Sequence, residues 1–174
     1  MEHKLEVWLF TDRVGTLALV GGRLNFCYAP AWLSQADAVA LSASLPLQAE
    51  PFDDRRTRPF FAGLLPEGQM RRLIAQQFQV SDQNDFALLD HIGGECAGAV
   101  TFLEPGQTLP VPSGNDDVQW LSDEEVVAIL DELPRRPMLA GKDGLRLSLA
   151  GAQDKLPVVF DGARIGLPLI DQAR

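Results

Sequence analysis

Three short runs near the amino terminus alternate apolar and polar side chains, and two turn sequences separate them. The runs are 5–10, 14–20 and 23–28, and the turns are Thr11-Asp12-Arg13 and Gly21-Gly22. Alternation with a period of two is typical of a strand with one buried face, and tight turns join successive strands into hairpins. The sequence therefore predicts an antiparallel meander of three strands, and this meander limits the possible folds more than any other segment does.

Less regular patterns follow Ala29-Pro30, which ends the third strand. Residues 36–43 are small and fit either a short helix or a loop. Residues 41–47 alternate like a strand that stops at a proline. Residues 53–58 are polar and charged, which predicts an exposed loop.

Helical spacing of apolar side chains begins after this loop. We expect two helical pieces, 60–65 and 69–78, with Pro66-Glu67-Gly68 as the turn between them. The same turn is a candidate protein-binding surface, because loops between helices often carry binding residues.

A third helix is predicted up to Gly93-Gly94, with Ser81 or Asp82 as its N-cap. The apolar run in residues 97–103 then predicts a strand that can return to the meander.

Proline, glycine and aspartate are frequent in residues 104–117, which predicts a linker or long loop and a subdomain boundary. Ser122 and Glu125 have the spacing of a capping box for a helix that ends near Leu133. Asp161-Gly162-Ala163 predicts a hairpin turn.

A loop of small residues lies between two apolar runs, 145–149 and 156–160. Small side chains let backbone N–H groups approach a phosphate closely, and a lysine adds a point charge. Kinase-like folds cover the phosphates of ATP with a strand, a loop of small residues and a second strand. An ordinary hairpin connection fits the same composition. The candidate phosphate-binding residues are Ser148, Leu149, Ala150, Gly151, Ala152, Gln153 and Lys155.

The charge balance argues against direct nucleic-acid binding. The 174 residues carry a formal net charge of -9, so most of the surface should repel phosphate backbones. The longest apolar runs are broken by charges well before the length of a membrane span, and the first residues do not resemble a signal peptide. We therefore expect a cytoplasmic protein that does not contact a membrane.

Cysteine and histidine do not predict a metal or catalytic centre. Cys27 and Cys96 permit one pairing, but in a cytoplasmic chain buried free thiols are the favoured state. His3 and His91 have no second ligand at metal spacing. We assign no catalytic residue and no metal ligand.

Five motifs occur in one order that resembles the HipA-type toxins, which are serine/threonine protein kinases of bacterial toxin–antitoxin modules. The resemblance extends from Leu5 to Pro168. The motifs are Tyr28–Leu33, Leu41–Leu47, Phe60-Phe61 with Leu64–Gly68, Gly94–Val100 and Ser148–Lys155.

The resemblance implies an α+β protein with a mostly antiparallel, barrel-like sheet and packed helices, followed by the start of a kinase-like amino lobe. Residues 1–108 would be the HipA N-terminal subdomain, 109–134 a linker with a capped helix, and 135–174 an incomplete amino lobe with its glycine-rich loop. In the intact family the loop covers ATP with Mg²⁺, Ser148 matches a serine that is autophosphorylated, and a helix-turn-helix antitoxin is the partner.

The chain departs from the family in the groups that perform phosphoryl transfer. Kinases need a lysine after the loop, a catalytic Asp and ligands for Mg²⁺. The lysines here are Lys4, Lys142 and Lys155, and none stands on the strand after the loop. We therefore expect a chain of this length to be inactive and to bind no cofactor alone.

A second hypothesis is a stand-alone module that resembles this subdomain and inhibits a partner kinase by docking on it. Such a module has no need of the loop at 148–155, so the loop favours the first hypothesis.

Overall fold

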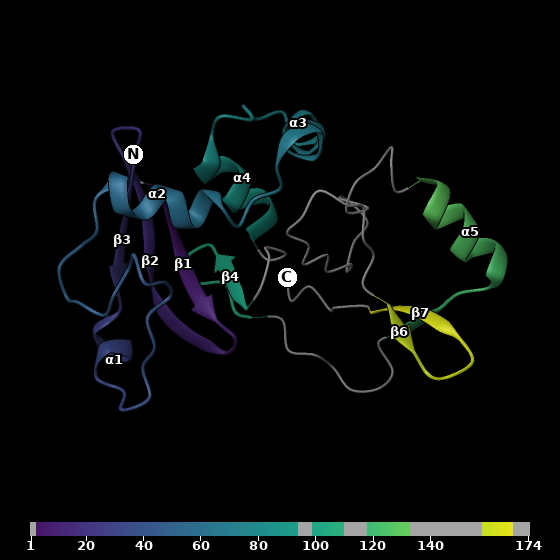
Figure 1. Ribbon diagram of the computed structural model, residues 1–174, viewed down its shortest axis with the longest axis horizontal. Coiled ribbons are helices and arrows are strands. Elements are labelled where there is room, and N and C mark those ends of the chain that lie inside the picture. Colours follow the sequence, from purple (N-terminus) through teal and green to yellow (C-terminus); the bar gives the residue numbers. More distant parts are fainter. Residues whose placement is uncertain (1–2, 94–98, 110–117, 133–157, 169–174) are drawn as a thin grey trace.

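An antiparallel sheet of four strands forms the amino-terminal part of the computed structural model, which describes residues 3–93, 99–109, 118–132 and 158–168. The predicted three-stranded meander is confirmed, and the predicted return of the segment before residue 104 is also confirmed, because β4 pairs with β1. The strands are β1 (His3–Leu9), β2 (Asp12–Val20), β3 (Arg23–Tyr28) and β4 (Val100–Leu103), in the order β3-β2-β1-β4 (Figure 1).

This sheet is open in the described part of the chain. Strands β3 and β4 lie at its two margins and do not pair with each other, so the expected barrel-like closure is not confirmed. The outer margin of β3 is nevertheless occupied by the same chain. Phe26 and Phe52 exchange both backbone hydrogen bonds, and the Leu24 N–H donates to the Asp54 carboxylate at 2.6 Å.

The prediction of an exposed loop at 53–58 is wrong, because helix α2 (Asp54–Ala62) begins there. Asp53 is the N-cap, and its carboxylate accepts a hydrogen bond from the Arg56 N–H at 3.1 Å. Thr57 and Phe61, one helical turn apart, are buried, while charged residues occupy the exposed side. The charged sequence is therefore the solvated face of an amphipathic helix.

The predicted strand at 41–47 is also wrong. Only an isolated bridge between Ser42 and Leu45 occurs there, and the surrounding residues form turns. The Tyr28 hydroxyl accepts from the Leu41 N–H at 2.8 Å and donates to the Leu45 carbonyl at 2.5 Å. A buried side chain thus supplies the partners that a neighbouring strand would have supplied. Of the two alternatives for 36–43, the loop is the correct one.

Two helices on either side of Pro66-Glu67-Gly68 are confirmed, although the first begins earlier than predicted. They are α2 and α3 (Gly68–Gln77). The third predicted helix is α4 (Asp85–Ile92), and its N-cap is Asn84 instead of Ser81 or Asp82. Ser81 accepts a hydrogen bond from the Gln83 N–H in the preceding turn, so its side chain is used before the helix begins. A short helix, α1 (Pro30–Leu33), follows β3.

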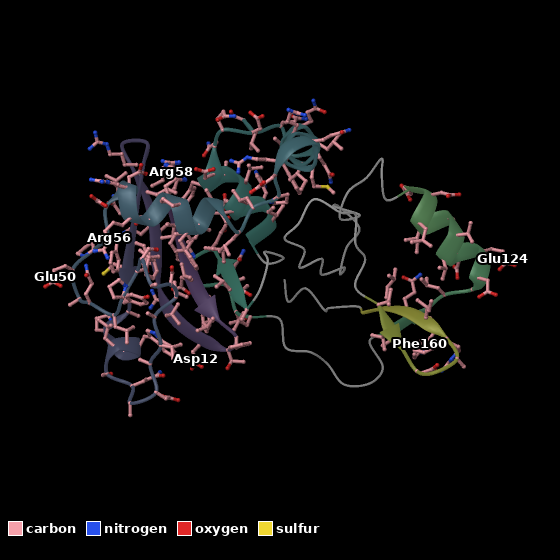
Figure 2. The ribbon with its side chains drawn as sticks, viewed as in Figure 1. Asp12, Glu50, Arg56, Arg58, Glu124 and Phe160 are labelled. Atoms are coloured by element: carbon pink, nitrogen blue, oxygen red, sulfur yellow. The ribbon has the colours of Figure 1, made fainter. Side chains whose placement is uncertain are left out.

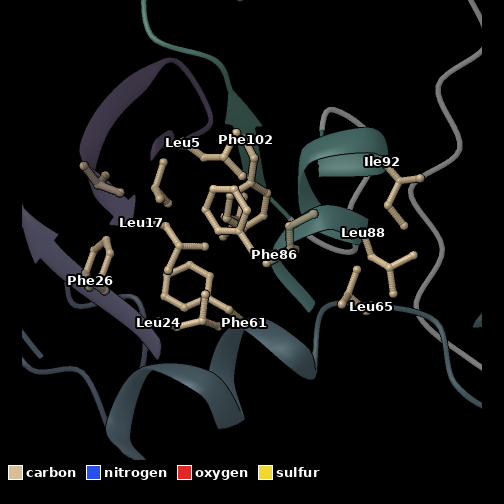
Figure 3. Packing of buried hydrophobic residues seen from close by; sticks show 14 of the residues in the cluster. Leu5, Leu17, Leu24, Phe26, Phe61, Leu65, Phe86, Leu88, Ile92 and Phe102 are labelled. Atoms are coloured by element: carbon tan, nitrogen blue, oxygen red, sulfur yellow. The ribbon is translucent and has the colours of Figure 1, made fainter. Parts of the chain in front are cut away.

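The core lies between one face of the sheet and helices α2 and α4 (Figure 3). The Phe61 ring of α2 packs 5.3 Å from that of Phe26 and 5.7 Å from that of Phe102, measured between ring centroids. Phe86 and Leu88 of α4 belong to the same buried cluster. Because side chains alternate along a strand, the residues between these buried ones face away from the helices.

A second, smaller sheet contains β5 (Val118–Trp120), β6 (Val159–Phe160) and β7 (Ile165–Pro168), in the order β5-β7-β6. The hairpin turn at 161–163 is confirmed, whereas β5 was not predicted. Helix α5 (Asp123–Glu132) has the predicted capping box: the Glu125 N–H donates to Ser122 Oγ at 3.2 Å, and the Ser122 N–H donates to Glu125 Oε2 at 2.8 Å.

The proposed division at residues 108 and 134 stays a prediction, because 110–117 and 133–157 lie outside the described residues. None of the helices in the described ranges has the length and apolar character that crossing a membrane requires.

Candidate functional site

The phosphate-binding loop predicted from the sequence lies outside the described residues. This applies to all of its candidate residues, Ser148, Leu149, Ala150, Gly151, Ala152, Gln153 and Lys155, and to Cys96. Their roles, including autophosphorylation at Ser148, stay predictions.

Within the described residues, the candidate site is the face of the four-stranded sheet that points away from α2 and α4. We call it the outer face. The strand register places two rows of side chains on it, each crossing β3, β2 and β1 in that order. One row is Asn25, Ala18 and Lys4, and the other is Cys27, Thr16 and Glu6.

A groove of about 550 Å³ lies on the outer face. Pro51, in the segment that precedes α2, lines one side, and Pro105, which follows β4, lines the other. Thr16, Ala18 and Cys27 contribute its small-residue lining. The volume lies within the range of about 300–1,000 Å³ that is usual for binding sites in proteins.

Three charged side chains line the groove, and the cationic ones are the more exposed. Arg13 Nε lies 3.0 Å from Glu6 Oε1, and the two side chains are 44% and 17% exposed respectively. Arg13 also donates to Thr16 Oγ at 3.3 Å. Lys4 is the third charged residue and is exposed. The groove therefore presents positive charge in a protein whose net charge is -9.

A separate cluster of charges joins helices α2, α3 and α4. Asp85, the first residue of α4, is only 7% exposed and accepts hydrogen bonds from Arg58 of α2 at 2.6 Å and from Arg71 of α3 at 2.5 Å. Arg58, which is labelled in Figure 2, also pairs with Asp54 at 2.8 Å. We call Asp54, Arg58, Arg71 and Asp85 the helix-joining cluster. Because every member has a partner within the protein, the cluster stabilises the fold and offers no reactive group.

Hydrogen bonding shifts the pKa values of two groups in this cluster. The hydrogen bond from Arg58 lowers the pKa of the Asp54 carboxyl, against an opposing effect of burial, and the Leu24 N–H lowers it further. The hydrogen bond to Asp54 correspondingly raises the pKa of Arg58. Both shifts favour the charged forms that make the pair.

The remaining candidates from the sequence lie apart from the groove. His91 stacks on Phe78 with ring centroids 4.8 Å apart, and His3 packs edge-on against Phe86. Glu67 and Gly68 are exposed at the turn before α3, whereas Pro66 is buried. In the described ranges no three His, Cys, Asp or Glu side chains form a group that could hold a metal ion.

Sequence reasoning missed the groove because its residues come from separated segments. The signal that was present is the polar half of the alternation, namely Lys4, Glu6, Thr16 and Asn25. Which of these side chains become neighbours depends on the register between strands, and the alternation alone does not specify it.

A family model described as the HipA N-terminal domain matches residues 5–103. The chain is 49% identical over 156 residues to the putative kinase Y4mE of Sinorhizobium fredii, an alignment that covers 87% of this chain and 37% of that protein. It is 30% identical over 160 residues to the serine/threonine-protein kinase toxin HipA of Shewanella oneidensis, covering 91% and 35% of the two chains. The chain thus spans about a third of the length of these relatives.

A shorter relative and a solved structure are also similar to the chain. A Haemophilus influenzae protein, described only as uncharacterized, is 28% identical over 102 residues, which are 59% of this chain and 92% of that protein. The solved structure is the HipA, HipB and operator DNA complex of the Shewanella oneidensis toxin–antitoxin system. The fold matches a chain of that complex with a TM-score of 0.68 at 26% identity, over 95% of this chain and 38% of the other.

Proposed function

The chain belongs to the HipA N-terminal domain family, and from this membership we propose that it forms the amino-terminal part of a HipA-like serine/threonine protein kinase of a toxin–antitoxin module. The observation that carries the proposal is the extent of the alignment with proteins described as kinases. It reaches 91% of the chain, well beyond the family match at residues 5–103.

In this proposal the described domain contributes contacts to a helix-turn-helix antitoxin. The similar solved structure holds a HipA protein together with HipB, which supports an antitoxin partner. The outer face supports the same role, because it combines a groove with charged and polar side chains that no described helix covers. That complex also contains operator DNA, so it lends no support to the expectation that the chain avoids nucleic acid.

We further propose that residues 148–155 cover the phosphates of ATP in the intact kinase. The alignment with the Shewanella toxin leaves less than a tenth of the chain unaligned. It therefore includes residues 148–155, whichever end of the chain is left out. A complete site also needs Mg²⁺ ligands and a catalytic Asp. Because the 174 residues span only about a third of the length of the kinase relatives, we propose that the chain alone transfers no phosphate.

Two measurements test this function. The chain is co-expressed with any helix-turn-helix protein that is encoded beside its gene, and we expect the two to co-purify as a complex. Separately, the purified chain is incubated with Mg²⁺ and radiolabelled ATP, and we expect no label on Ser148. Failure of the antitoxin to bind would contradict the docking role, and incorporation of label would contradict the proposed inactivity.

A stand-alone inhibitor of a partner kinase is the second candidate. The Haemophilus relative favours it, because the aligned 102 residues make up nearly all of that protein. The chain is added to a full-length HipA-like kinase from the same genome, and autophosphorylation of the kinase is measured. Inhibition by the chain, without antitoxin binding, would replace the first proposal with this one.

A further inference from the structure

We propose that the groove on the outer face binds an extended, acidic segment of a protein partner. The inference rests on the proposed docking function and specifies the chemistry of the ligand. It is argued from the dimensions, the charges and the hydrogen-bonding groups of the groove.

The dimensions fit a short extended peptide. The groove runs from Pro51, beside β3, to Pro105, after β4, so it crosses the strands. Three spacings of about 4.8 Å between four strands amount to about 14 Å, which is the length of about four extended residues. A helix lying on the same face would be held away from the small residues Ala18 and Cys27 by its greater diameter.

The charges select an acidic ligand. Arg13 is 44% exposed although it pairs with Glu6, and Glu6 is only 17% exposed. A guanidinium group has five N–H donors, and the contacts to Glu6 and Thr16 leave donors available for a carboxylate. Lys4 adds a second cation on the neighbouring row. These cations therefore attract a carboxylate to the groove, although the protein as a whole carries a negative net charge.

The polar groups of the groove suit a peptide backbone. The side-chain amide of Asn25 makes no hydrogen bond to another described residue, and an amide can both donate to a carbonyl and accept from an N–H. The Thr16 hydroxyl accepts from Arg13, so its own hydrogen remains available to a ligand carbonyl. Nucleic acid is a poorer fit, because the net charge of -9 disfavours the phosphates that would extend beyond the groove.

The test selects short peptides from a displayed random library on the purified chain, with a Cys96→Ser background. We expect the enriched peptides to be rich in Asp and Glu. Affinity should fall about tenfold or more in the double variant Lys4→Gln with Arg13→Gln. Ala18→Trp, which fills the groove without a change of charge, should also abolish binding. The matched control is Arg55→Gln with Arg72→Gln, because it removes two exposed cations from α2 and α3.

The Cys27 thiol, which lines the groove, shows whether a selected peptide binds there. Its alkylation by iodoacetamide should become slower when the peptide is bound. No enrichment of acidic peptides would overturn the inference, as would equal losses of affinity in the groove and control variants. Tighter binding of a single-stranded oligonucleotide, weakened by the same groove variants, would replace the peptide with nucleic acid. Thermal melts of all variants identify any that fail to fold.

The antitoxin assay separates this inference from the proposed function. If the antitoxin co-purifies equally with the wild-type chain and with the groove variants, the docking function stands and the groove inference fails. If acidic peptides bind in the groove and no antitoxin binds, the inference stands and the proposed partner is wrong.

Discussion

Among single residues, Asp85 joins three helices, α2, α3 and α4. It is almost fully buried, and its two carboxylate oxygens accept from Arg58 and Arg71 on two other helices. A buried charged group without its partner costs several kcal/mol, but these arginines remain 34% and 19% exposed, so water can compensate part of the loss. Asp85 also lies in the first turn of α4, where a negative charge is favourable.

We predict that Asp85→Asn lowers the free energy of unfolding by about 2 kcal/mol. Urea denaturation followed by circular dichroism gives the value. Asp90→Asn is the matched control, because Asp90 is exposed on the same helix. Equal effects of the two substitutions would show that Asp85 contributes no more than a surface charge.

The lowered pKa of Asp54 predicts that acid destabilises the folded protein. Arg58 lowers the pKa of its carboxyl below the ordinary value of 3.8. A depressed pKa in the folded state stabilises the protein above the pKa of the unfolded chain, and this contribution is lost as the pH falls through the folded value. We expect the urea midpoint to fall below about pH 4, and to fall less in Asp54→Asn. A parallel pH profile in Asp54→Asn would contradict this assignment.

Tyr28 is the single tyrosine of the chain, so its ionisation can be followed by ultraviolet absorbance. Burial raises the pKa of its hydroxyl above 10.0, and the hydrogen bond from Leu41 opposes this effect. We expect the tyrosinate absorbance to appear above pH 10 in the folded chain and nearer pH 10 in urea. Because the pKa of Tyr28 is higher in the folded chain than in the unfolded chain, the neutral hydroxyl stabilises the fold below the unfolded pKa. This contribution is lost as the pH rises through the folded pKa.

Tyr28→Phe should lower the free energy of unfolding by about 1–3 kcal/mol, since it leaves the Leu41 N–H and the Leu45 carbonyl without the hydroxyl. Ser34→Ala, which removes an exposed hydroxyl with one hydrogen bond, is the control. Amide exchange at Leu41 should also become faster. Unchanged stability and exchange would mean that the hydroxyl does not hold the loop.

Among whole elements, the start of helix α2 shows why part of the fold could not be predicted from the sequence. The sequence predicts the meander well, because alternation and paired glycines are local signals. Helix α2 begins in a charged stretch, and its first buried residue, Thr57, is polar, so the apolar periodicity starts late. The segment at 41–47 alternates like a strand, but the Tyr28 hydroxyl satisfies its backbone from a distant position.

Asp53→Ala should lower the free energy of unfolding by about 1 kcal/mol, because the Arg56 N–H at the start of α2 loses its side-chain acceptor and keeps only the Asp53 carbonyl. Chemical denaturation measures the change, with Asp37→Ala as an exposed control. Asp53→Asn should retain most of the stability, since an amide oxygen can also cap a helix. A loss as large in Asp53→Asn as in Asp53→Ala would point to charge instead of capping.

In the molecule as a whole, the described residues before 104 supply almost all of the buried hydrophobic cluster. They supply all members of this cluster except Ile129 and Leu167, and the 102 residues aligned with the Haemophilus relative make up nearly all of that protein. The candidate groove belongs to the same unit. Its existence follows from strand register and could not be predicted from the sequence, whereas the loop at 148–155 was predicted and stays untested.

We therefore predict that a fragment of residues 1–109 folds without the rest of the chain. Thermal unfolding followed by circular dichroism should show one cooperative transition, and peptides selected on the full chain should bind the fragment with similar affinity. A fragment without a cooperative transition would show that the later residues are needed for this core.

The bridge between Phe26 and Phe52, with the Asp54 carboxylate on the Leu24 N–H, has a consequence for encounters between molecules. A strand from a second molecule that approaches this margin finds three backbone groups already bonded. Addition of such a strand would require α2 to detach at its first residue. The protein is thereby protected on that side from fibril growth and strand exchange, even when it is concentrated.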